Sequence, residues 1–414
     1  MNKIYFPNLN GLRFVAAMLV LIHHLEFTSP SFDKFHWYSH FTLSVGKLGV
    51  ILFFTLSGFL ITYLLLAEKE ITSTISLKFF YIRRILRIWP LYFFIVLSAL
   101  FVLPHVGRIF YSSNDIQELH RDFALKSTLL LTILPNINYA FSLIVPFAVQ
   151  AWSIGVEEQF YLSWPLILRK FTSIAKVFIY VIFIYLGIYF LIIIFQTYSP
   201  TNTLNQLLFF WRHFCIDCMA IGGLFAYIAY KKKPISEFFQ KNFIYFPTLI
   251  ITMFLLLKGV VIPYLNYEIY SILFGVIIYN FACNKLCVIN LENNIFNYLG
   301  KISYGLYMYH ILSIHITAQL NAMFFRIQPH AFNQLYFYIT SILITILIST
   351  LSYELFEKRF IKAGKTETVQ FKITVENLKF YNQNMHFIAE PGIFKVFVGT
   401  SSAKTNEAGF ELID

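Results

Sequence analysis

The sequence predicts an all-α, polytopic integral membrane protein of about ten transmembrane helices with a short, partial β tail. Of its 414 residues, 58% are hydrophobic and only 13% are charged, whereas soluble domains carry about a quarter charged residues. The apolar residues also gather into stretches of roughly 17–24, the length that crosses a hydrocarbon core of about 30 Å. We therefore expect most of the chain to lie in a bilayer.

The expected spans are separated by short polar connections. The ten spans cover residues 9–27, 48–66, 86–103, 153–169, 177–195, 207–229, 243–258, 267–283, 303–324 and 335–356. A further stretch, 123–141, is apolar in its middle but contains Lys126 and Pro135. We expect this stretch to be re-entrant or interfacial, because polar and kinked segments at membrane depth need protein partners.

The net charge of +11 is unevenly spread over the connections. Lys and Arg are concentrated on one set of them, near 69–84, 169–176, 231–241, 285–301 and 358–365. Basic loops stay in the cytoplasm, so both termini are expected there. The same pattern explains the positive charge without a nucleic-acid partner. Cys215 and Cys218 form a CxxC with no second ligand pair nearby, so we expect buried side chains and no metal.

Composition changes after Lys362, which divides the chain into a membrane domain, 1–361, and a β-rich cytoplasmic tail, 362–414. The tail alternates between apolar and polar residues at 369–373, 394–398 and 409–413. This period of two predicts short strands.

Ionisable groups inside a membrane are costly, so each is a functional candidate. Arg13 and His24 lie eleven residues apart in the first span, which places them on one helix face about 16 Å apart. His23 points about 100° away from His24. From position alone, two interpretations of these histidines are equally supported: a functional role, or a location at the outer membrane interface.

Arg83, Arg84 and Arg87 crowd the start of the third span. Anchoring at the cytoplasmic surface explains the first two. Arg84 and Arg87 share a face at i,i+3, and paired guanidinium groups suit phosphate.

Two adjacent carboxylates, Glu157 and Glu158, enter the fourth span. A carboxylate in lipid needs a partner, and His24 is available near the same membrane face. His310 in the ninth span is read more simply as a hydrogen-bonded core residue. Arg212 and Asp217 are read as a mutual or interfacial pair.

Six segments, in order, resemble the acyltransferase family 3 membrane proteins over about residues 1–361. They are GLRFVAAMLVLIHH, GVILFFTLSGFLI, RRILRIWPLY, WSIGVEEQFYL, ISYGLYMYHI and SYELFEKRFI. The tail, through EPGIFKVFVGTSSA and KTETVQFKITVENLKFY, resembles the end of the fibronectin-III-like C-terminal domain of family-3 glycosidases. The family of the membrane part includes O-acetyltransferases that modify bacterial O-antigens and other surface glycans.

The resemblance implies residue roles. His24 matches the family's essential histidine, and Arg13 its partner on the same helix. Arg84 and Arg87 match the cytoplasmic R-x-x-R motif, which with Arg13 is expected to bind the donor.

Glu157 or Glu158 matches the glutamate of the W-S-x-x-x-E motif, so both join His24 as catalytic candidates. The implied function is transfer of an acyl group, with acetyl expected, from acyl-CoA to a hydroxyl of a surface polysaccharide at a bacterial inner membrane. His24 would act as a general base or accept the acyl group itself. A proton-coupled transporter or flippase of a glycan-type substrate is the alternative, since such carriers also hold Arg, His and Glu in their spans.

Overall fold

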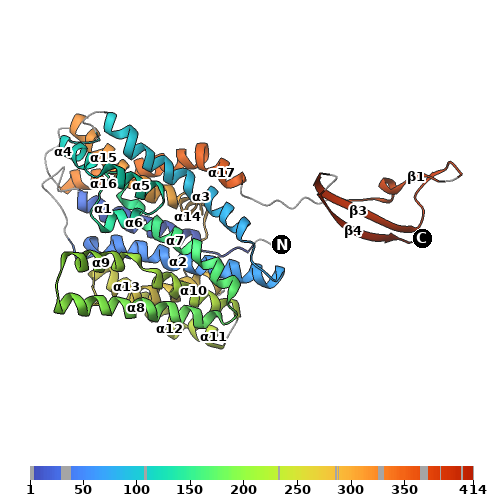
Figure 1. The fold of residues 1–414 in the computed structure, drawn as a ribbon, viewed down its shortest axis with the longest axis horizontal. Helices are drawn as coiled ribbons and strands as arrows, with labels where there is room; N and C mark the ends of the chain where they lie inside the picture. The colour runs from blue at the N-terminus through green and yellow to red at the C-terminus, as the bar shows by residue number, and fades with distance from the viewer. Residues whose placement is uncertain are drawn as a thin grey trace. The chain divides into compact units, whose positions relative to one another are not determined.

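The computed structural model describes residues 4–28, 39–106, 110–231, 234–284, 287, 289–324, 331–363, 372–382, 384–401 and 404–413. The chain forms two compact units, Met1–Gly364 and Lys365–Asp414. The first unit is helical and the second contains the strands (Figure 1).

Helices account for nearly all of the first unit. They are α1 (Leu9–Thr28), α2 (His40–Thr72), α3 (Leu77–Leu97), α4 (Ser113–His120), α5 (Phe123–Leu131), α6 (Pro135–Ala140), α7 (Trp152–Lys170), α8 (Ile174–Tyr198), α9 (Asn202–Phe214), α10 (Ile216–Lys231), α11 (Pro234–Gln240), α12 (Asn242–Lys258), α13 (Asn266–Cys283), α14 (Asn294–Lys301), α15 (Ser303–Phe324), α16 (Ala331–Ser352) and α17 (Lys358–Ala363). Short 3₁₀ or π turns extend α3 (Ser98–Val102, Leu103–His105), precede α7 (Val149–Ala151) and extend α16 (Tyr353–Glu357). Every expected span falls on a helical segment.

Six helical segments in the described ranges are long and apolar enough to cross a membrane. They are Leu9–Phe27, His40–Thr72, Leu77–His105, Ile174–Tyr198, Asn202–Lys231 and Gln334–Ile361. The other expected spans fall on α7, α12, α13 and α15, which are shorter or more polar. A mostly helical architecture with six candidate membrane spans is therefore observed, and the count of about ten spans stays a prediction.

The span expected at 207–229 is not one continuous helix. Cys215 takes a left-handed conformation, with φ of 39°, between α9 and α10. Its thiol donates a hydrogen bond to the carbonyl oxygen of Arg212 at 3.1 Å. That bond satisfies a carbonyl that the end of α9 leaves without a helical partner, so the break is stabilised locally.

Two short helices, α5 and α6, occupy the stretch 123–141. The longer of them, α5, has 9 residues and rises about 14 Å, less than half of a hydrocarbon core. The Lys126 side chain is buried, and its ammonium group forms an ion pair with Glu118 at 3.3 Å. The stretch is therefore divided into two short helices, and its buried ammonium group is paired with a protein carboxylate. Both features agree with a segment that does not cross the membrane.

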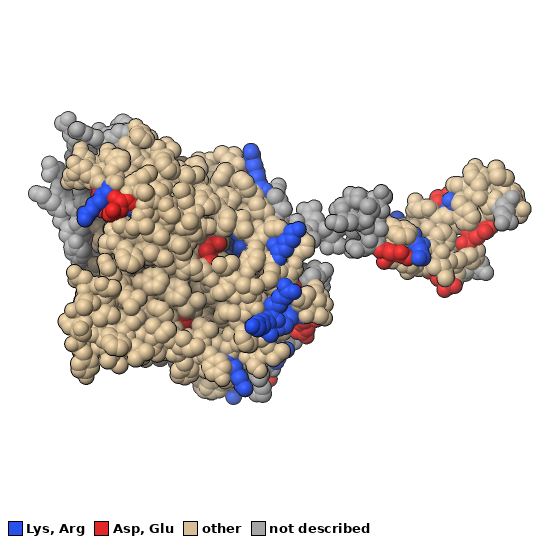
Figure 2. Space-filling view, in the orientation of Figure 1, with Lys and Arg blue, Asp and Glu red and all other residues tan. Residues whose placement is uncertain are grey.

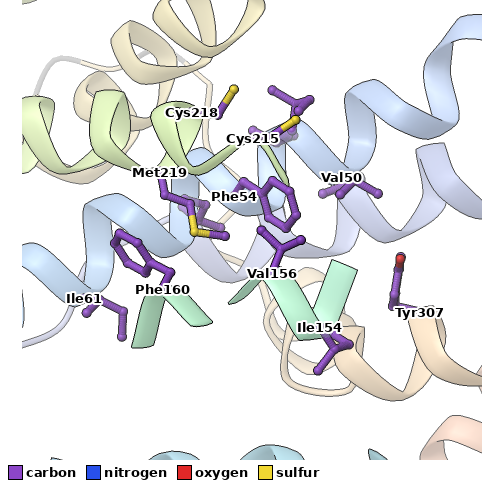
Figure 3. Close-up of a cluster of buried hydrophobic side chains, with 14 of the residues drawn as sticks. Val50, Phe54, Ile61, Ile154, Val156, Phe160, Cys215, Cys218, Met219 and Tyr307 are labelled. Carbon is purple, nitrogen blue, oxygen red and sulfur yellow. The ribbon is translucent and has the colours of Figure 1, made fainter. Parts of the chain in front are cut away.

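The centre of the helical unit is α2, which packs against α1, α7, α10 and α13. Figure 3 shows Phe54 and Ile61 of α2 among side chains of α7 and α10, including Phe160 and Met219. Glycines allow the closest approach. A Cβ atom at Gly58 would overlap the backbone of Met219, and one at Gly222 would overlap the backbone of Thr55. Helices in lipid associate through such small residues, because apolar burial from water no longer drives packing.

Basic residues are unevenly placed on the helical unit. On the face drawn in Figure 2, most of its Lys and Arg gather at the end where α11 and α17 lie in Figure 1. A charge band at one end of a helical bundle is typical of a membrane protein. The location of the termini in the cytoplasm stays a prediction.

The second unit contains two antiparallel hairpins. β1 (Phe380–Tyr381) pairs with β2 (Phe387–Ile388), and β3 (Gly392–Ser401) pairs with β4 (Lys404–Leu412). The strands expected at 394–398 and 409–413 correspond to β3 and β4. The strand expected at 369–373 is wrong where it can be judged: 369–371 lie outside the described residues, and 372–373 are not in a strand. Among the described residues, 372–373 pair with no strand, and alternation by itself does not supply a partner.

The contact between α2 and α10 generates a prediction. Gly222→Val should lower the free energy of unfolding by about 1–3 kcal/mol or more, because the new side chain must displace the α2 backbone. The measurement is the thermal unfolding midpoint of the purified protein in detergent. Gly187→Val is the matched control, since nothing lies within 4 Å of a Cβ atom there. Equal midpoints for the two variants would show that the α2–α10 contact is not tight.

Candidate functional site

A cavity of about 210 Å³ lies between α1, α2, α3, α7 and α15. One part of its wall is apolar and consists mainly of α2 side chains. The polar part is formed by Arg13, Ser57, Arg84, Arg87, Ser153, Glu157, Tyr161, Tyr304 and Tyr307. Residues nearly 300 positions apart therefore meet in one chamber, which makes it the leading candidate for a ligand site.

The cavity contains three guanidinium groups. Arg13 projects from α1, and Arg84 and Arg87 project from α3. Arg84 lies over the ring of Tyr161, 5.4 Å from its centroid. In contrast, Arg83 lies at the surface and faces Glu68 at 3.7 Å. The sequence prediction that Arg84 and Arg87 share a helix face is confirmed, and the structure places Arg83 apart from both.

The three cavity arginines form no ion pair with Glu157, the carboxylate that lines the same cavity. Over the ranges that the structure describes, none of them forms a hydrogen bond or an ion pair. Charged groups within a membrane protein ordinarily pair with one another or with backbone carbonyls. Three like charges that share one chamber therefore favour an anionic ligand there.

The adjacent carboxylates Glu157 and Glu158 have separate environments. Glu157 faces the cavity, where it accepts hydrogen bonds from Ser57 and Tyr161, both at 3.0 Å. Glu158 accepts a hydrogen bond from the indole nitrogen of Trp89 at 3.0 Å and does not line the cavity. Successive residues on a helix differ by about 100° in direction, so only one of the two can face the arginines.

The two adjacent histidines also diverge. The Nδ1 atom of His24 lies 2.9 Å from the carbonyl oxygen of Val20, one turn earlier in α1. The Nδ1 atom of His23 lies 2.7 Å from the carbonyl oxygen of Thr42 in α2. His23 packs directly on Gly46, where an added Cβ atom would overlap its ring. His23 is therefore committed to the α1–α2 contact.

The expectation that Glu157 or Glu158 would face His24 is wrong. Both carboxylate oxygens of Glu157 are bound by Ser57 and Tyr161, and Glu158 turns toward Trp89. The side chain beside His24 is instead His310 of α15, with ring centroids 4.6 Å apart. Sequence reasoning placed His310 in the core, which is correct, since it is 0% exposed. It missed the partner because the relative placement of α1 and α15 is not encoded in either segment.

Tyr307 joins the cavity to the histidines. Its side chain lines the cavity, and its hydroxyl is bonded to Ser153 at 2.7 Å and to the carbonyl oxygen of Gln150 at 2.9 Å. Its own carbonyl oxygen accepts a hydrogen bond from Nδ1 of His310. His24 and His310 are not among the residues that line the cavity, so the site has two adjoining parts.

The sixth expected span departs from its sequence interpretation. Arg212 and Asp217 form no ion pair within the described residues, and the Arg212 guanidinium lies 6.0 Å from the ring centroid of Tyr267. Cys215 and Cys218 are buried and are not joined in a disulfide. Arg212 and Asp217 lie five residues apart, one in α9 and the other in α10, and the break at Cys215 falls between them.

Comparison with known proteins gives two domain matches. A family model described as an acyltransferase domain matches residues 6–354. A second, described as a fibronectin type III-like domain, matches residues 354–402. No solved structure matches.

Two curated relatives with similar sequences come from bacteria. The peptidoglycan O-acetyltransferase OatA of Listeria monocytogenes is 32% identical over 180 residues, which cover 42% of this chain and 26% of the relative. The O-acetyltransferase OatA of Staphylococcus aureus is 27% identical over 383 residues, which cover 87% of this chain and 58% of the relative. The matched part of the chain thus covers about a quarter of the length of the first relative and little more than half of the length of the second.

The hydrogen bonds to Glu157 generate a prediction. The double variant Ser57→Ala, Tyr161→Phe removes both donors to a carboxylate inside the bundle. We expect the free energy of unfolding to fall by about 1–3 kcal/mol, measured from the thermal midpoint. Adding Glu157→Gln to this variant should recover part of the loss, because a neutral amide is less costly to bury.

Tyr180→Phe is the control for this pair of substitutions, since Tyr180 is 61% exposed and its hydroxyl should not be required for stability. An unchanged midpoint in the double variant would mean that water or a proton satisfies Glu157.

Proposed function

The chain belongs to the acyltransferase family 3, and we propose that it is a membrane O-acyltransferase acting on a cell-surface carbohydrate. The acyl group, expected to be acetyl, would come from acyl-CoA and pass to a carbohydrate hydroxyl. Two observations support this function: the family match over most of the helical unit and relatives that carry the name O-acetyltransferase. Peptidoglycan, the substrate in the name of one relative, is a candidate acceptor.

The observation that carries the proposal is the cavity with Arg13, Arg84 and Arg87, which share it with the single carboxylate Glu157 and form no ion pair among the described residues. Coenzyme A carries phosphate groups, which guanidinium binds through paired hydrogen bonds. The apolar α2 wall of the same cavity offers contact to the uncharged part of the donor. A bound donor would replace the missing counter-charges.

The proposed chemistry needs a base or nucleophile, and His24 is the candidate. A carbonyl oxygen only accepts hydrogen bonds, so Nδ1 of His24 donates to Val20. In the neutral ring Nε2 then carries the lone pair. As a base, Nε2 takes the proton of the acceptor hydroxyl while its oxygen attacks the thioester carbonyl. The carbon–sulfur bond breaks, and the proton passes to the thiolate.

Two routes remain for the acyl group. In the first, His24 acts only as the base. In the second, Nε2 of His24 attacks the thioester, holds the acyl group and passes it to the hydroxyl. Glu157, as the carboxylate in the cavity, would orient the arginines in either route. Glu158 does not line the cavity, so we assign it a smaller role in the transfer than Glu157.

The proposed orientation follows from loop charge. About ten spans would cross a bacterial inner membrane, with both termini in the cytoplasm. The donor would enter from the cytoplasm, and the acceptor would approach from the opposite face. The second unit, Lys365–Asp414, holds none of the candidate residues, so it is not assigned a part in the transfer.

The proposed activity predicts a mass change on surface glycans. Cells with the gene should carry glycan repeats heavier by one acyl group than cells without it, as measured by mass spectrometry. His24→Ala should abolish the gain, since loss of a general base costs about 10²–10⁴-fold. His23→Ala should retain a substantial fraction, because His23 faces α2. Glu157→Gln should reduce the gain more than Glu158→Gln.

An unmodified but mislocalised glycan in the deletion strain would instead support the transporter. Loss of activity in His23→Ala with full activity in His24→Ala would reverse the assignment of the two histidines.

The donor site generates a separate prediction. The double variant Arg84→Ala, Arg87→Ala should raise the donor KM by about tenfold or more and lower kcat less, because phosphate contacts bind ground and transition states alike. Arg83→Ala is the matched control on the same helix and should keep the donor KM within about twofold, since its pair with Glu68 is at the surface. An unchanged KM in the double variant would assign these arginines to membrane anchoring.

A further inference from the structure

A groove on the helical unit lies apart from the cavity that contains the three arginines. It is formed by α8, α9 and the connection 259–265, and its volume is about 400 Å³. This volume is within the range of about 300–1,000 Å³ that ligand pockets occupy. The groove and the cavity share no lining residue. The groove is therefore a second, separate candidate for a ligand site.

Two polar side chains of the groove retain unused hydrogen-bonding atoms among the residues that the structure describes. The amide nitrogen of Gln196 donates to Oδ1 of Asn205 at 2.7 Å, but Oε1 of Gln196 is buried and accepts no hydrogen bond. The guanidinium of Arg212 forms neither a hydrogen bond nor an ion pair. Glu268 lines a small adjoining pocket with Arg212, yet the two lie beyond ion-pair distance. The groove thus offers a ligand both an acceptor and several donors.

Aromatic rings line the same groove. Tyr189 and Tyr264 both belong to its wall, and Tyr264 is 63% exposed. An aromatic ring has a large apolar face, which can pack against the C–H face of a sugar, and each sugar hydroxyl both donates and accepts hydrogen bonds. An ionised carboxylate or a phosphodiester only accepts, so it would leave Oε1 of Gln196 unsatisfied. The combination of groups therefore favours a sugar over a simple anion.

Hydrogen bonds hold the walls of the groove in place. The hydroxyl of Tyr185 in α8 donates to the carbonyl oxygen of Trp211 in α9 at 2.6 Å, and the Trp211 indole donates back to the carbonyl oxygen of Tyr185 at 3.1 Å. In the connection, the backbone amide of Ile262 donates to Oδ1 of Asn266 at 2.8 Å. These bonds form without a ligand, so little ordering is left to oppose binding.

The groove also lies where the acceptor is expected to approach. The connections 199–201 and 259–265 contain no Lys or Arg, so they belong to the set expected on the face opposite the cytoplasm. The donor arginines Arg84 and Arg87 lie near the start of α3, which is expected at the cytoplasmic face. Donor and acceptor would thus be bound from opposite sides of the membrane.

We propose that this groove binds a chain of sugars and holds the acceptor at a distance from the hydroxyl that receives the acyl group. This inference rests on the proposed function. Oε1 of Gln196 accepts a hydrogen bond from one sugar hydroxyl, Arg212 donates to another sugar oxygen, and Tyr264 packs on the sugar ring. Contacts remote from the reacting group that bind the ground state and the transition state equally lower the acceptor KM and leave kcat unchanged.

The test measures binding of a tetramer of N-acetylglucosamine, an uncharged sugar chain, to the full-length protein in lipid nanodiscs by saturation-transfer NMR. Gln196→Leu and Arg212→Leu should each raise the Kd about tenfold, the effect of losing one hydrogen bond. Gln206→Leu is the matched control, because Gln206 is exposed on α9 and does not line the groove; it should keep the Kd within about twofold. His24→Ala should also keep the Kd, since binding requires no chemical step.

Inorganic phosphate is the second probe. Absence of tetramer binding, or an equal Kd in the unsubstituted protein and Gln196→Leu, would overturn the inference. Phosphate binding that depends on Arg212, without tetramer binding, would identify an anion site and overturn it as well. None of these results bears on acyl transfer. Conversely, tetramer binding through Gln196 in a protein whose cells carry no acylated glycan would support the groove and overturn the proposed function.

Discussion

The backbone contact between α2 and its neighbours is the constraint on which the rest of the helical unit depends. Gly58 and Gly222 leave no side chain where α2 meets α10, so carbonyl groups and Cα atoms approach directly. With α2 seated this closely, the residues on its other faces are brought to α1 and α7. Ser57 then reaches Glu157, and Phe54 reaches Trp152. In lipid, this fit replaces the hydrophobic driving force of a soluble core.

Electrostatics then determine how the cavity can be used. Glu157 is the one carboxylate among the lining residues of the described cavity, and it faces three arginines. Its oxygens accept hydrogen bonds from Ser57 and Tyr161, and within the described residues it forms no ion pair with a guanidinium. An excess of positive charge therefore remains in a low-dielectric setting, where it repels itself and attracts an anion. The same arrangement would be a liability in a helix bundle without a ligand.

Tyr307 separates the charged cavity from the two histidines and is bonded to both sides. In the proposed function, arginines that would hold a donor and a histidine that would move a proton have different needs. The first require access for a large polyanion, and the second requires a dry pocket with fixed hydrogen bonds. The placement of one tyrosine between them meets both needs.

The sequence by itself determined the class of the protein, the positions of the helices and the residues that share a helix face. Length and apolar composition are sufficient for the first two. The third follows from a rotation of about 100° per residue, which placed Arg84 with Arg87 and separated His24 from His23. Only the tertiary structure decided which faces meet. It chose Glu157 over Glu158 for the cavity, paired His24 with His310 and broke the 207–229 span at Cys215. The physical reason is that contacts within a helix depend on local geometry, whereas contacts between helices depend on rotations and offsets set by the packing of the whole bundle.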